Sequence, residues 1–273
     1  MGPVRLLVSD VDGTLVTTGK VLTPASVAAA ARLREAGVAL ALVSSRPPRG
    51  MAGIAERLGL RTPLAGFNGG TVLDAGGRLL SERLVPEDAA RLALAAFERR
   101  GIDAWVFADG EWLLRDPEGY YVPLERRTIG FGPRVVGDLA PFLGRAGKLV
   151  GASRDHALLA ECETALRGDL GAAATAHRSQ LYYLDVTHPE ADKGRALLAL
   201  AGLLGVDPGE TACIGDMAND LPMFAVAGLA VAMGNAPPAV RAAAAAVTLS
   251  NDADGFAAAV RDIVLPLAPG RAA

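Results

Sequence analysis

The chain has 273 residues, of which 51% are hydrophobic and 21% charged, with a formal net charge of −3 at pH 7. This length suits one large domain or two modest ones, and the apolar fraction is ample for a packed core. The small negative charge gives no electrostatic reason to expect nucleic acid or an anionic membrane as a partner.

The cysteines, the histidines and the first residues carry no special signal. Cys162 and Cys213 lie far apart in apolar surroundings, which indicates core thiols in a reducing compartment rather than a disulfide. The three histidines are scattered singly, so surface or capping roles are favoured over metal ligation. Neither a secretion signal nor a membrane span is indicated, because the apolar runs are interrupted. We therefore predict a cytoplasmic protein.

The first strand pattern ends in two carboxylates. Residues 4–8 form a short apolar run that leads into the sequence DVDGT, which contains Asp10, Asp12 and Gly13. Residues two apart on a strand share a face, so both carboxylates can converge on one point; if the chain bends here, Asp12 instead offers its backbone carbonyl. Gly13 suits a bend, because glycine tolerates positive φ and the close approach of a ligand.

Helix and strand patterns then alternate. A Thr-Pro pair predicts the start of a helix over residues 25–35. The apolar run at 38–43 predicts a second buried strand, which would deliver Ser44, Ser45 and Arg46 to the same edge of the sheet. The next predicted elements are a helix at 50–58, a strand at 64–67 ending at Asn68 and Gly69, and a hairpin at 71–80.

The pattern changes between residues 84 and 187. Predicted helices lie at 86–99 and 155–167, and predicted strands at 102–107, 111–115, 148–152 and 181–186. Most of the Trp and Tyr residues of the chain fall here, and filling the core of a small domain explains them better than contact with a substrate. We interpret residues 84–187 as a second, α+β domain.

The alternation returns at Lys193. The predicted elements are a helix at 193–204, a strand at 210–214, a polar loop with Asp216, Asn219 and Asp220, a helix from 221, a strand at 229–233, helices from 237 through the Ala-rich stretch 242–246 and at 255–265, and a frayed tail at 266–273. The sequence thus predicts an α/β fold. Its Rossmann-like, doubly wound parallel sheet is discontinuous over residues 1–83 and 188–273, and the α+β domain is inserted between the two parts.

Four carboxylates are expected at one edge of this sheet, from Asp10, Asp12, Asp216 and Asp220. Gathered there, they would repel one another unless their pKa values rise or a cation lies among them. Hard oxygen ligands favour Mg²⁺. Lys193 could be an ordinary surface lysine, but its position relative to the acidic loop favours a functional role.

Together these elements resemble the motifs of the haloacid dehalogenase (HAD) superfamily. DVDGT resembles motif one, Ser44 motif two, Lys193 motif three, and Asp216 with Asn219 and Asp220 motif four. The large insert between motifs two and three is similar to that of the type II (C2-capped), Cof-like phosphatases, where the inserted domain is a cap. Ser45 departs from the Thr-Gly-Arg pattern that is frequent in that group.

The resemblance implies phosphoryl transfer. Asp10 would attack phosphorus to form an aspartyl-phosphate, and Asp12 would protonate the leaving alkoxide and then activate water. Asp10, the backbone carbonyl of Asp12 and Asp216 would hold Mg²⁺. Ser44 and Lys193 would hold the phosphate oxygens, while Asn219 and Asp220 would orient Lys193 and the metal-bound waters.

The resemblance also implies a substrate class. The cap would close over a small phosphorylated metabolite, most simply a sugar phosphate. The chain is expected to act as a monomer or homodimer. The residues implied to contact substrate or phosphate are Gly13, Ser45, Arg46, Asn68 and Gly69, with Arg178 as a weaker candidate.

Two alternatives stay open. A phosphomutase of the same superfamily would return the phosphoryl group instead of releasing it. A non-catalytic phosphate-binding or regulatory protein, such as a receiver-like domain, also presents an acidic Mg²⁺ cluster, an aspartate acceptor and a lysine. Such a receiver needs no acid/base two residues after its acceptor and has no insert of a hundred residues, which favours the phosphatase.

Overall fold

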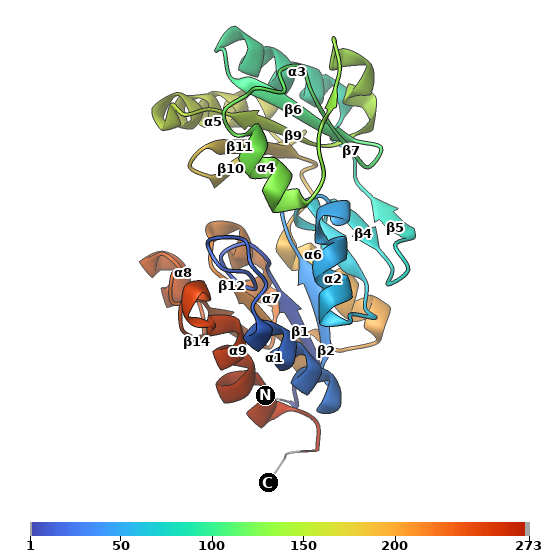
Figure 1. Cartoon of the computed structure of the whole chain (residues 1–273), viewed down its shortest axis with the longest axis vertical. Coiled ribbons are helices and arrows are strands. Elements are labelled where there is room, and N and C mark those ends of the chain that lie inside the picture. Colours follow the sequence, from blue (N-terminus) through green and yellow to red (C-terminus); the bar gives the residue numbers. More distant parts are fainter. Residues whose placement is uncertain (1, 271–273) are drawn as a thin grey trace.

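The computed structural model describes residues 2–270 and contains two β-sheets (Figure 1). The core sheet has eight strands in the order β14-β13-β12-β1-β2-β3-β4-β5, and the cap sheet has six in the order β10-β11-β9-β6-β7-β8. In Figure 1 the core and both labelled termini lie in the lower part of the view and the cap lies above. The predicted α/β fold with an inserted α+β cap is confirmed.

Six strands of the core sheet are parallel, and β4 and β5 add an antiparallel hairpin at one edge. β1 lies centrally, with Leu6 opposite Thr211 of β12 and Ala39 of β2. In sheet order the strands are β14 (Ala246–Val247), β13 (Leu229–Ala232), β12 (Thr211–Gly215), β1 (Leu6–Ser9), β2 (Ala39–Val43), β3 (Leu64–Gly66), β4 (Thr71–Leu73) and β5 (Leu79–Glu82).

Helices cover both faces of the core sheet, because its parallel strands are apolar on both sides. Successive residues of β1 show this, since Leu7 belongs to one hydrophobic cluster while Leu6 and Val8 belong to the other. The first face packs against α1 (Pro24–Glu35), α2 (Ala52–Leu58) and α9 (Gly255–Ala259). The second packs against α6 (Lys193–Leu204), α7 (Leu221–Val226) and α8 (Pro238–Ala242).

The cap sheet also has two different faces. One packs against α3 (Glu87–Arg99) and α5 (His156–Leu170). The other faces α4 (Val122–Ile129) and the core, whose Phe67 joins its aromatic cluster. In sheet order the strands are β10 (Thr175–Gln180), β11 (Tyr183–Thr187), β9 (Ala146–Ala152), β6 (Asp103–Ala108), β7 (Glu111–Leu114) and β8 (Arg134–Val135).

Two local predictions were wrong. The Ala-rich stretch 242–246 is not a helix: α8 ends at Ala242, and β14 pairs with β13, so sheet pairing overrides the helix propensity of alanine. The tail is not frayed at residues 266–268, because Leu265–Leu267 forms a 3₁₀ turn whose last carbonyl accepts the Val4 N–H at 2.7 Å. Residues 271–273 of the predicted tail lie outside the described residues. The sequence analysis also missed α4 and β10.

The chain passes between the two sheets on both sides of the insert. The N–H of Arg83 donates to Gly70 of the core, whereas that of Val85 donates to Ala146 of the cap. We propose residues 84 and 187 as the limits of the cap. Both cysteines are buried and unpaired, as expected. Within residues 2–270, every helix is too short or too polar to cross a membrane.

Candidate active site

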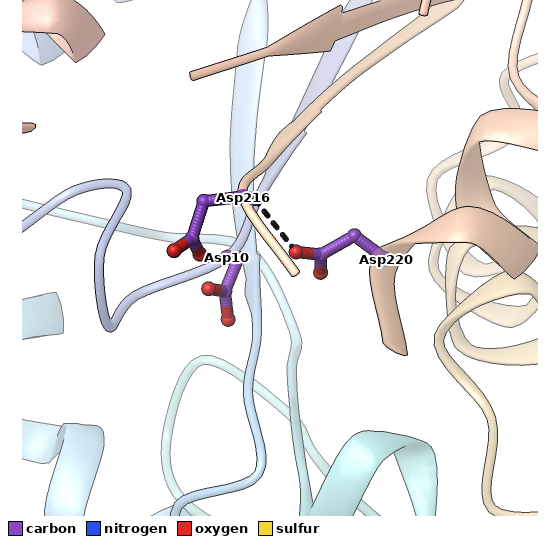
Figure 2. A group of neighbouring side chains, drawn as sticks. All are labelled: Asp10, Asp216 and Asp220. Carbon is purple, nitrogen blue, oxygen red and sulfur yellow. Dashed lines mark hydrogen bonds between the residues drawn. The ribbon is translucent and has the colours of Figure 1, made fainter. Parts of the chain in front are cut away.

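Two buried carboxylates face one another at the C-terminal edge of the core sheet. Asp10 directly follows β1, and Asp216 directly follows the neighbouring strand β12. Figure 2 shows both side chains projecting into the same space, with Asp220 on the other side of the Asp216 backbone. Each of the three can offer one oxygen within 4.8 Å of the others. Adjacent parallel strands bring these residues together across 206 positions of sequence.

Lys193 neutralises part of this charge. Its ammonium donates to Oδ1 of Asp10 at 2.7 Å and to Oδ1 of Asp220 at 2.6 Å, and its side chain is fully buried. Burial alone would lower the pKa of Lys193, but the two carboxylates outweigh it and raise the pKa above its ordinary value. A cation at the N-terminal end of α6 interacts unfavourably with the helix dipole, and the ion pairs with Asp10 and Asp220 compensate for this.

Asp220 orients Lys193 and the loop after β12. Its Oδ2 accepts the backbone N–H groups of Asp216 at 2.8 Å and of Met217 at 2.9 Å, while its Oδ1 accepts Lys193. Both oxygens are therefore engaged by the protein. Asp220 is therefore a positioning residue, held by shorter contacts than the 3.2 and 3.3 Å hydrogen bonds that Asp216 accepts.

Gly13 allows Asp216 to reach this position. It adopts φ +77°, and a Cβ atom at this residue would overlap the carboxylate of Asp216. Asp216 is further held by the hydroxyl of Thr14 at 3.3 Å and by the side-chain amide of Asn235 at 3.2 Å. The glycine of the first motif is thus explained by packing against the fourth motif.

The electrostatics of Asp10 and Asp216 suit a divalent cation. Burial raises the pKa of Asp10 to about 7 against the opposing effect of Lys193. Burial, together with repulsion from Asp10, raises the pKa of Asp216 to about 8. Two facing carboxylates repel one another when both are ionised, and a cation between them removes this repulsion. Hard oxygen donors suit ions such as Mg²⁺. The residues present therefore fit a divalent metal.

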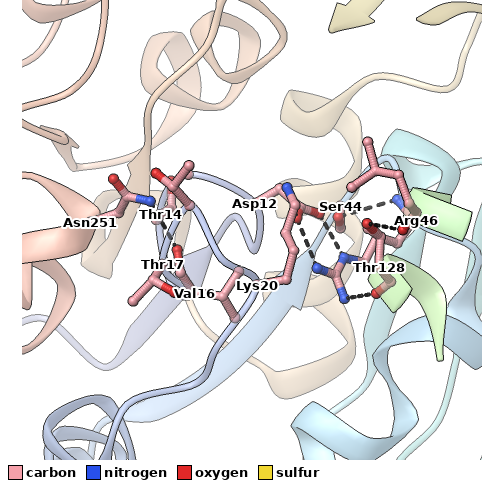
Figure 3. A network of polar contacts seen from close by, with 12 residues as sticks. Asp12, Thr14, Val16, Thr17, Lys20, Ser44, Arg46, Thr128 and Asn251 are labelled. Atoms are coloured by element: carbon pink, nitrogen blue, oxygen red, sulfur yellow. Dashed lines mark hydrogen bonds and ion pairs between the residues drawn. The ribbon is translucent and has the colours of Figure 1, made fainter. Parts of the chain in front are cut away.

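The carboxylate of Asp12 belongs to a second network, which Figure 3 shows together with Lys20 and Arg46. Its carboxylate accepts two bonds from Arg46, at 2.6 and 2.8 Å, and one from Lys20 at 2.7 Å. Arg46 also donates to the carbonyl of Thr128 in α4, so this guanidinium links the core to the cap. Burial would raise the pKa of Asp12, but Arg46 and Lys20 outweigh it and lower the pKa below its usual range.

The residues after β2 lie beside these networks. Ser44 is fully buried, and its hydroxyl accepts the backbone N–H of Arg46 at 3.2 Å. Ser45 contributes its carbonyl, which accepts the ammonium of Lys148 from the cap at 3.0 Å. The side chain of Arg46 is held by Asp12 and by backbone carbonyls, and it lines a small cavity together with Asp12 and Lys148.

Asn68 and Asn219 line a cavity of about 370 Å³ between core and cap. The amide of Asn219 donates to Oδ1 of Asn68 at 3.2 Å, and Nδ2 of Asn68 lies 3.4 Å from Nε2 of His177. Gly69, by contrast, packs against α6, since a Cβ atom there would press on Ala196. The cavity also reaches Lys193.

Comparison with known proteins connects this geometry to a family. The profile of the haloacid dehalogenase-like hydrolases matches residues 7–260. The chain belongs to this family. An HMP-PP phosphatase from Cronobacter sakazakii is 30% identical over 86% of this chain and 85% of its own. A 5-amino-6-(5-phospho-D-ribitylamino)uracil phosphatase from Bacillus subtilis is 27% identical, over 93% and 96% respectively.

Solved structures agree with this assignment. A haloacid dehalogenase-like hydrolase from Bacteroides thetaiotaomicron superposes with a TM-score of 0.85 and 28% identity, covering 95% of this chain and 99% of that one. A sugar phosphatase of HAD subclass IIB gives a TM-score of 0.81 at 20% identity, over 96% and 99%. The predicted type of HAD fold and the predicted enzyme class, a phosphoric monoester hydrolase, are confirmed.

A buried charged cluster on the cap, beside the core, was not predicted from the sequence. Lys148 and Asp185 form a buried ion pair at 3.2 Å, with Glu125 and His177 nearby. The available signal was a charged residue inside an apolar strand, at the start of β9 and in the middle of β11. Arg178, which was a candidate substrate contact, forms an ion pair with Glu163 at 2.8 Å.

Proposed function

We propose that the chain is a Mg²⁺-dependent phosphatase that hydrolyses small phosphorylated metabolites, sugar phosphates first, through an aspartyl-phosphate on Asp10. The observation that carries this proposal is the pairing of Asp10 with Asp216 at adjacent strand ends, while Lys193 bridges Asp10 and Asp220. It supports the assignment of the nucleophile, the metal ligands and a phosphate-binding cation to these residues.

Asp10 is suited to act as the nucleophile. Lys193 holds its Oδ1, and its Oδ2 makes no hydrogen bond with any residue between 2 and 270. Oδ2 is therefore free to attack phosphorus in line. Ser44 and Lys193 then bind the non-bridging oxygens of the phosphoryl group, where charge develops.

Asp12 serves as the acid and base. Protonated, it gives its proton to the leaving alkoxide; ionised, it takes a proton from the water that opens the aspartyl-phosphate. The contacts with Arg46 and Lys20 favour the ionised form, which suits the second step. For the first step Asp12 must hold a proton against the effect of Arg46 and Lys20, which lower its pKa.

The metal ligands are a carboxylate oxygen of Asp10, the backbone carbonyl of Asp12 and the carboxylate of Asp216. When bound, Mg²⁺ shields the nucleophile from the negative charge of the phosphate. Asp220 and Asn219 keep Lys193 and the loop after β12 in place.

The leaving group would occupy the cavity of about 370 Å³, which suits a small metabolite. Relatives named for their substrates act on HMP-PP, on a phospho-ribitylaminouracil and, in Escherichia coli, on pyridoxal phosphate. These share a small size and a phosphate ester rather than one leaving group.

Phosphate release tests the proposal. A panel of sugar phosphates, nucleotides, phosphoglycolate and pyridoxal phosphate is incubated with the wild type, Asp10→Asn and the control Asp169→Asn, with Mg²⁺ and with EDTA. Asp169 is an exposed cap residue, so its variant receives the same chemical change far from the site. We expect release only with Mg²⁺, retained in Asp169→Asn and abolished in Asp10→Asn, which should keep its unfolding temperature.

Two results would contradict the proposal. Turnover that survives in Asp10→Asn would remove the nucleophile. Absence of free phosphate together with transfer to a second sugar hydroxyl would indicate the phosphomutase instead.

A further inference from the structure

One face of the cap sheet carries buried polar side chains opposite the active site. Tyr183, Asp185 and Thr187 alternate along β11 and therefore share a face. Asp185 lies opposite His177 of β10, and Thr187 lies opposite Lys148 of β9. Tyr183 belongs to the cluster that includes Phe67 of the core, so this face is the one directed at the core.

Several polar atoms of this face lack partners. Oδ1 of Asp185, Oγ1 of Thr187 and Nδ1 of His177 are buried and make no hydrogen bond with any residue of the described chain. Asp185 is fully buried, and its other oxygen accepts Lys148 at 3.2 Å. An unpartnered buried carboxylate oxygen is costly, and at an interface between two domains it indicates a ligand that supplies the missing donor.

Lys148 has spare capacity of the complementary kind. Its ammonium carries three donors, of which one is used by Asp185 and one by the carbonyl of Ser45. The ammonium also lies 5.7 Å from the ring centre of Phe67 and 5.2 Å from that of Phe107. A ligand here therefore meets one free acceptor and one free donor, and the rings of Tyr182 and Tyr183 line the same small cavity as Lys148.

Charge decides the class of group that fits. The charges of Asp185 and Lys148 neutralise one another. A second phosphate or a carboxylate would be repelled by Asp185, and an ammonium group would be repelled by Lys148. A hydroxyl both donates and accepts, and it can satisfy Asp185 and Lys148 without a net charge. The aromatic rings suit the C–H faces of a polyol or sugar.

Lys148, Asp185 and His177 lie where the leaving group of a bound substrate would be expected. His177 lines the cavity of about 370 Å³ that reaches Lys193, and Lys148 lines a second, smaller cavity that reaches Asp12. Asp185 lies between His177 and Lys148 on the strand that joins them. A molecule held by phosphate at Asp10 would extend toward these residues.

We propose that Asp185, Lys148 and His177 bind the hydroxyl groups of the leaving group and make the enzyme selective for phosphate monoesters of sugars and polyols. This inference rests on the proposed function and deepens it. Selectivity of this kind comes from buried polar groups that a non-hydroxylated substrate would leave unpaired.

A matched pair of substrates tests this. Glucose 6-phosphate and cyclohexylmethyl phosphate share a six-membered ring and a primary alkoxide leaving group, but only the first carries ring hydroxyls. We expect the wild type to prefer glucose 6-phosphate by about 100-fold in kcat/KM. Asp185→Asn should lower kcat/KM for glucose 6-phosphate about 10-fold or more and change that for cyclohexylmethyl phosphate less than about 3-fold.

A control variant and four contrary outcomes complete the test. Asp169→Asn makes the same change on the exposed side of α5 and should leave both values unchanged. An equal loss on both substrates in Asp185→Asn would make Asp185 structural and overturn the inference. Equal wild-type efficiency on both would do so without any variant. Absence of Mg²⁺-dependent release from both substrates and from the whole panel above would overturn the proposed function itself, whereas release from the panel but not from glucose 6-phosphate or other sugar phosphates would overturn only this inference.

Discussion

Two buried lysines lie between core and cap, and their surroundings differ. Lys193 pairs with two carboxylates at 2.7 and 2.6 Å. Lys148 pairs with one carboxylate at 3.2 Å, and the second oxygen of that carboxylate is unpartnered. In the mechanism proposed above, the first lysine binds the phosphoryl group that every substrate shares, and its partners all belong to the core. The second would bind a part of the substrate that varies, which agrees with the unpartnered oxygen beside it.

Replacing the lysines should separate these roles most strongly. Lys193→Met leaves Asp10 and Asp220 buried without a counter-charge and removes a phosphate ligand, so kcat should fall about 10³-fold on every substrate. Lys148→Met should lower kcat/KM about 10-fold for glucose 6-phosphate and less for cyclohexylmethyl phosphate. Steady-state kinetics on both substrates checks this, and a uniform loss in both variants would remove the distinction.

The next largest effect is expected from the protonation of Glu125, which lies near Lys148. Burial raises the pKa of Glu125 to about 7, against the opposing effect of Lys148. At pH values between the ordinary pKa of a glutamate and 7, Glu125 holds a proton in the folded state that it has lost in the unfolded state. The free energy of unfolding therefore falls as pH rises through this range. Glu125→Gln should match the wild type near pH 4 and be more stable at pH 8, by on the order of 3 kcal/mol.

Urea unfolding of both proteins at the two pH values measures this. The charged groups that act on Glu125 are Lys148, Asp185, Asp12 and Arg46, and all of them are present in both proteins. A difference in stability that does not change with pH would show that Glu125 titrates normally.

The link between core and cap gives a smaller effect. Arg46 makes two bonds to Asp12 and one to Thr128 of α4, a planar arrangement that lysine cannot reproduce. Arg46→Lys should lower kcat about 10-fold and increase amide exchange in α4, because Asp12 and the cap lose a common partner. Normal exchange in α4 combined with a lower kcat would confine Arg46 to orienting Asp12.

The neighbouring arginine provides the smallest change. Arg49 is exposed and stacks over Phe131 at 4.4 Å from the ring centre. Exposed contacts of this kind contribute about 0.5–1 kcal/mol, so Arg49→Ala should change kcat/KM by less than about 3-fold. Kinetics measured beside Arg46→Lys checks this, and a loss as large as that of Arg46→Lys would make the whole segment after β2 important rather than one side chain.

The sequence predicted the core better than the cap. Strand ends that carry Asp10, Ser44 and Asp216 are readable because a short apolar run stops at a polar residue, and parallel strands must share one edge. In the cap, α4 and β10 were missed. β10 (Thr175–Gln180) has the sequence TAHRSQ. It is a polar edge strand without an apolar pattern.

The amino-acid sequence by itself determined the family and the order of the four motifs, because each motif is a short apolar run followed by particular polar residues, and such a pattern is local. Tertiary structure decided the rest. Asp12 turns to Arg46 and Lys20 because those cations fold against it. Lys148, Asp185 and His177 become neighbours only when three strands of the cap sheet pair, and no spacing in the sequence encodes that contact.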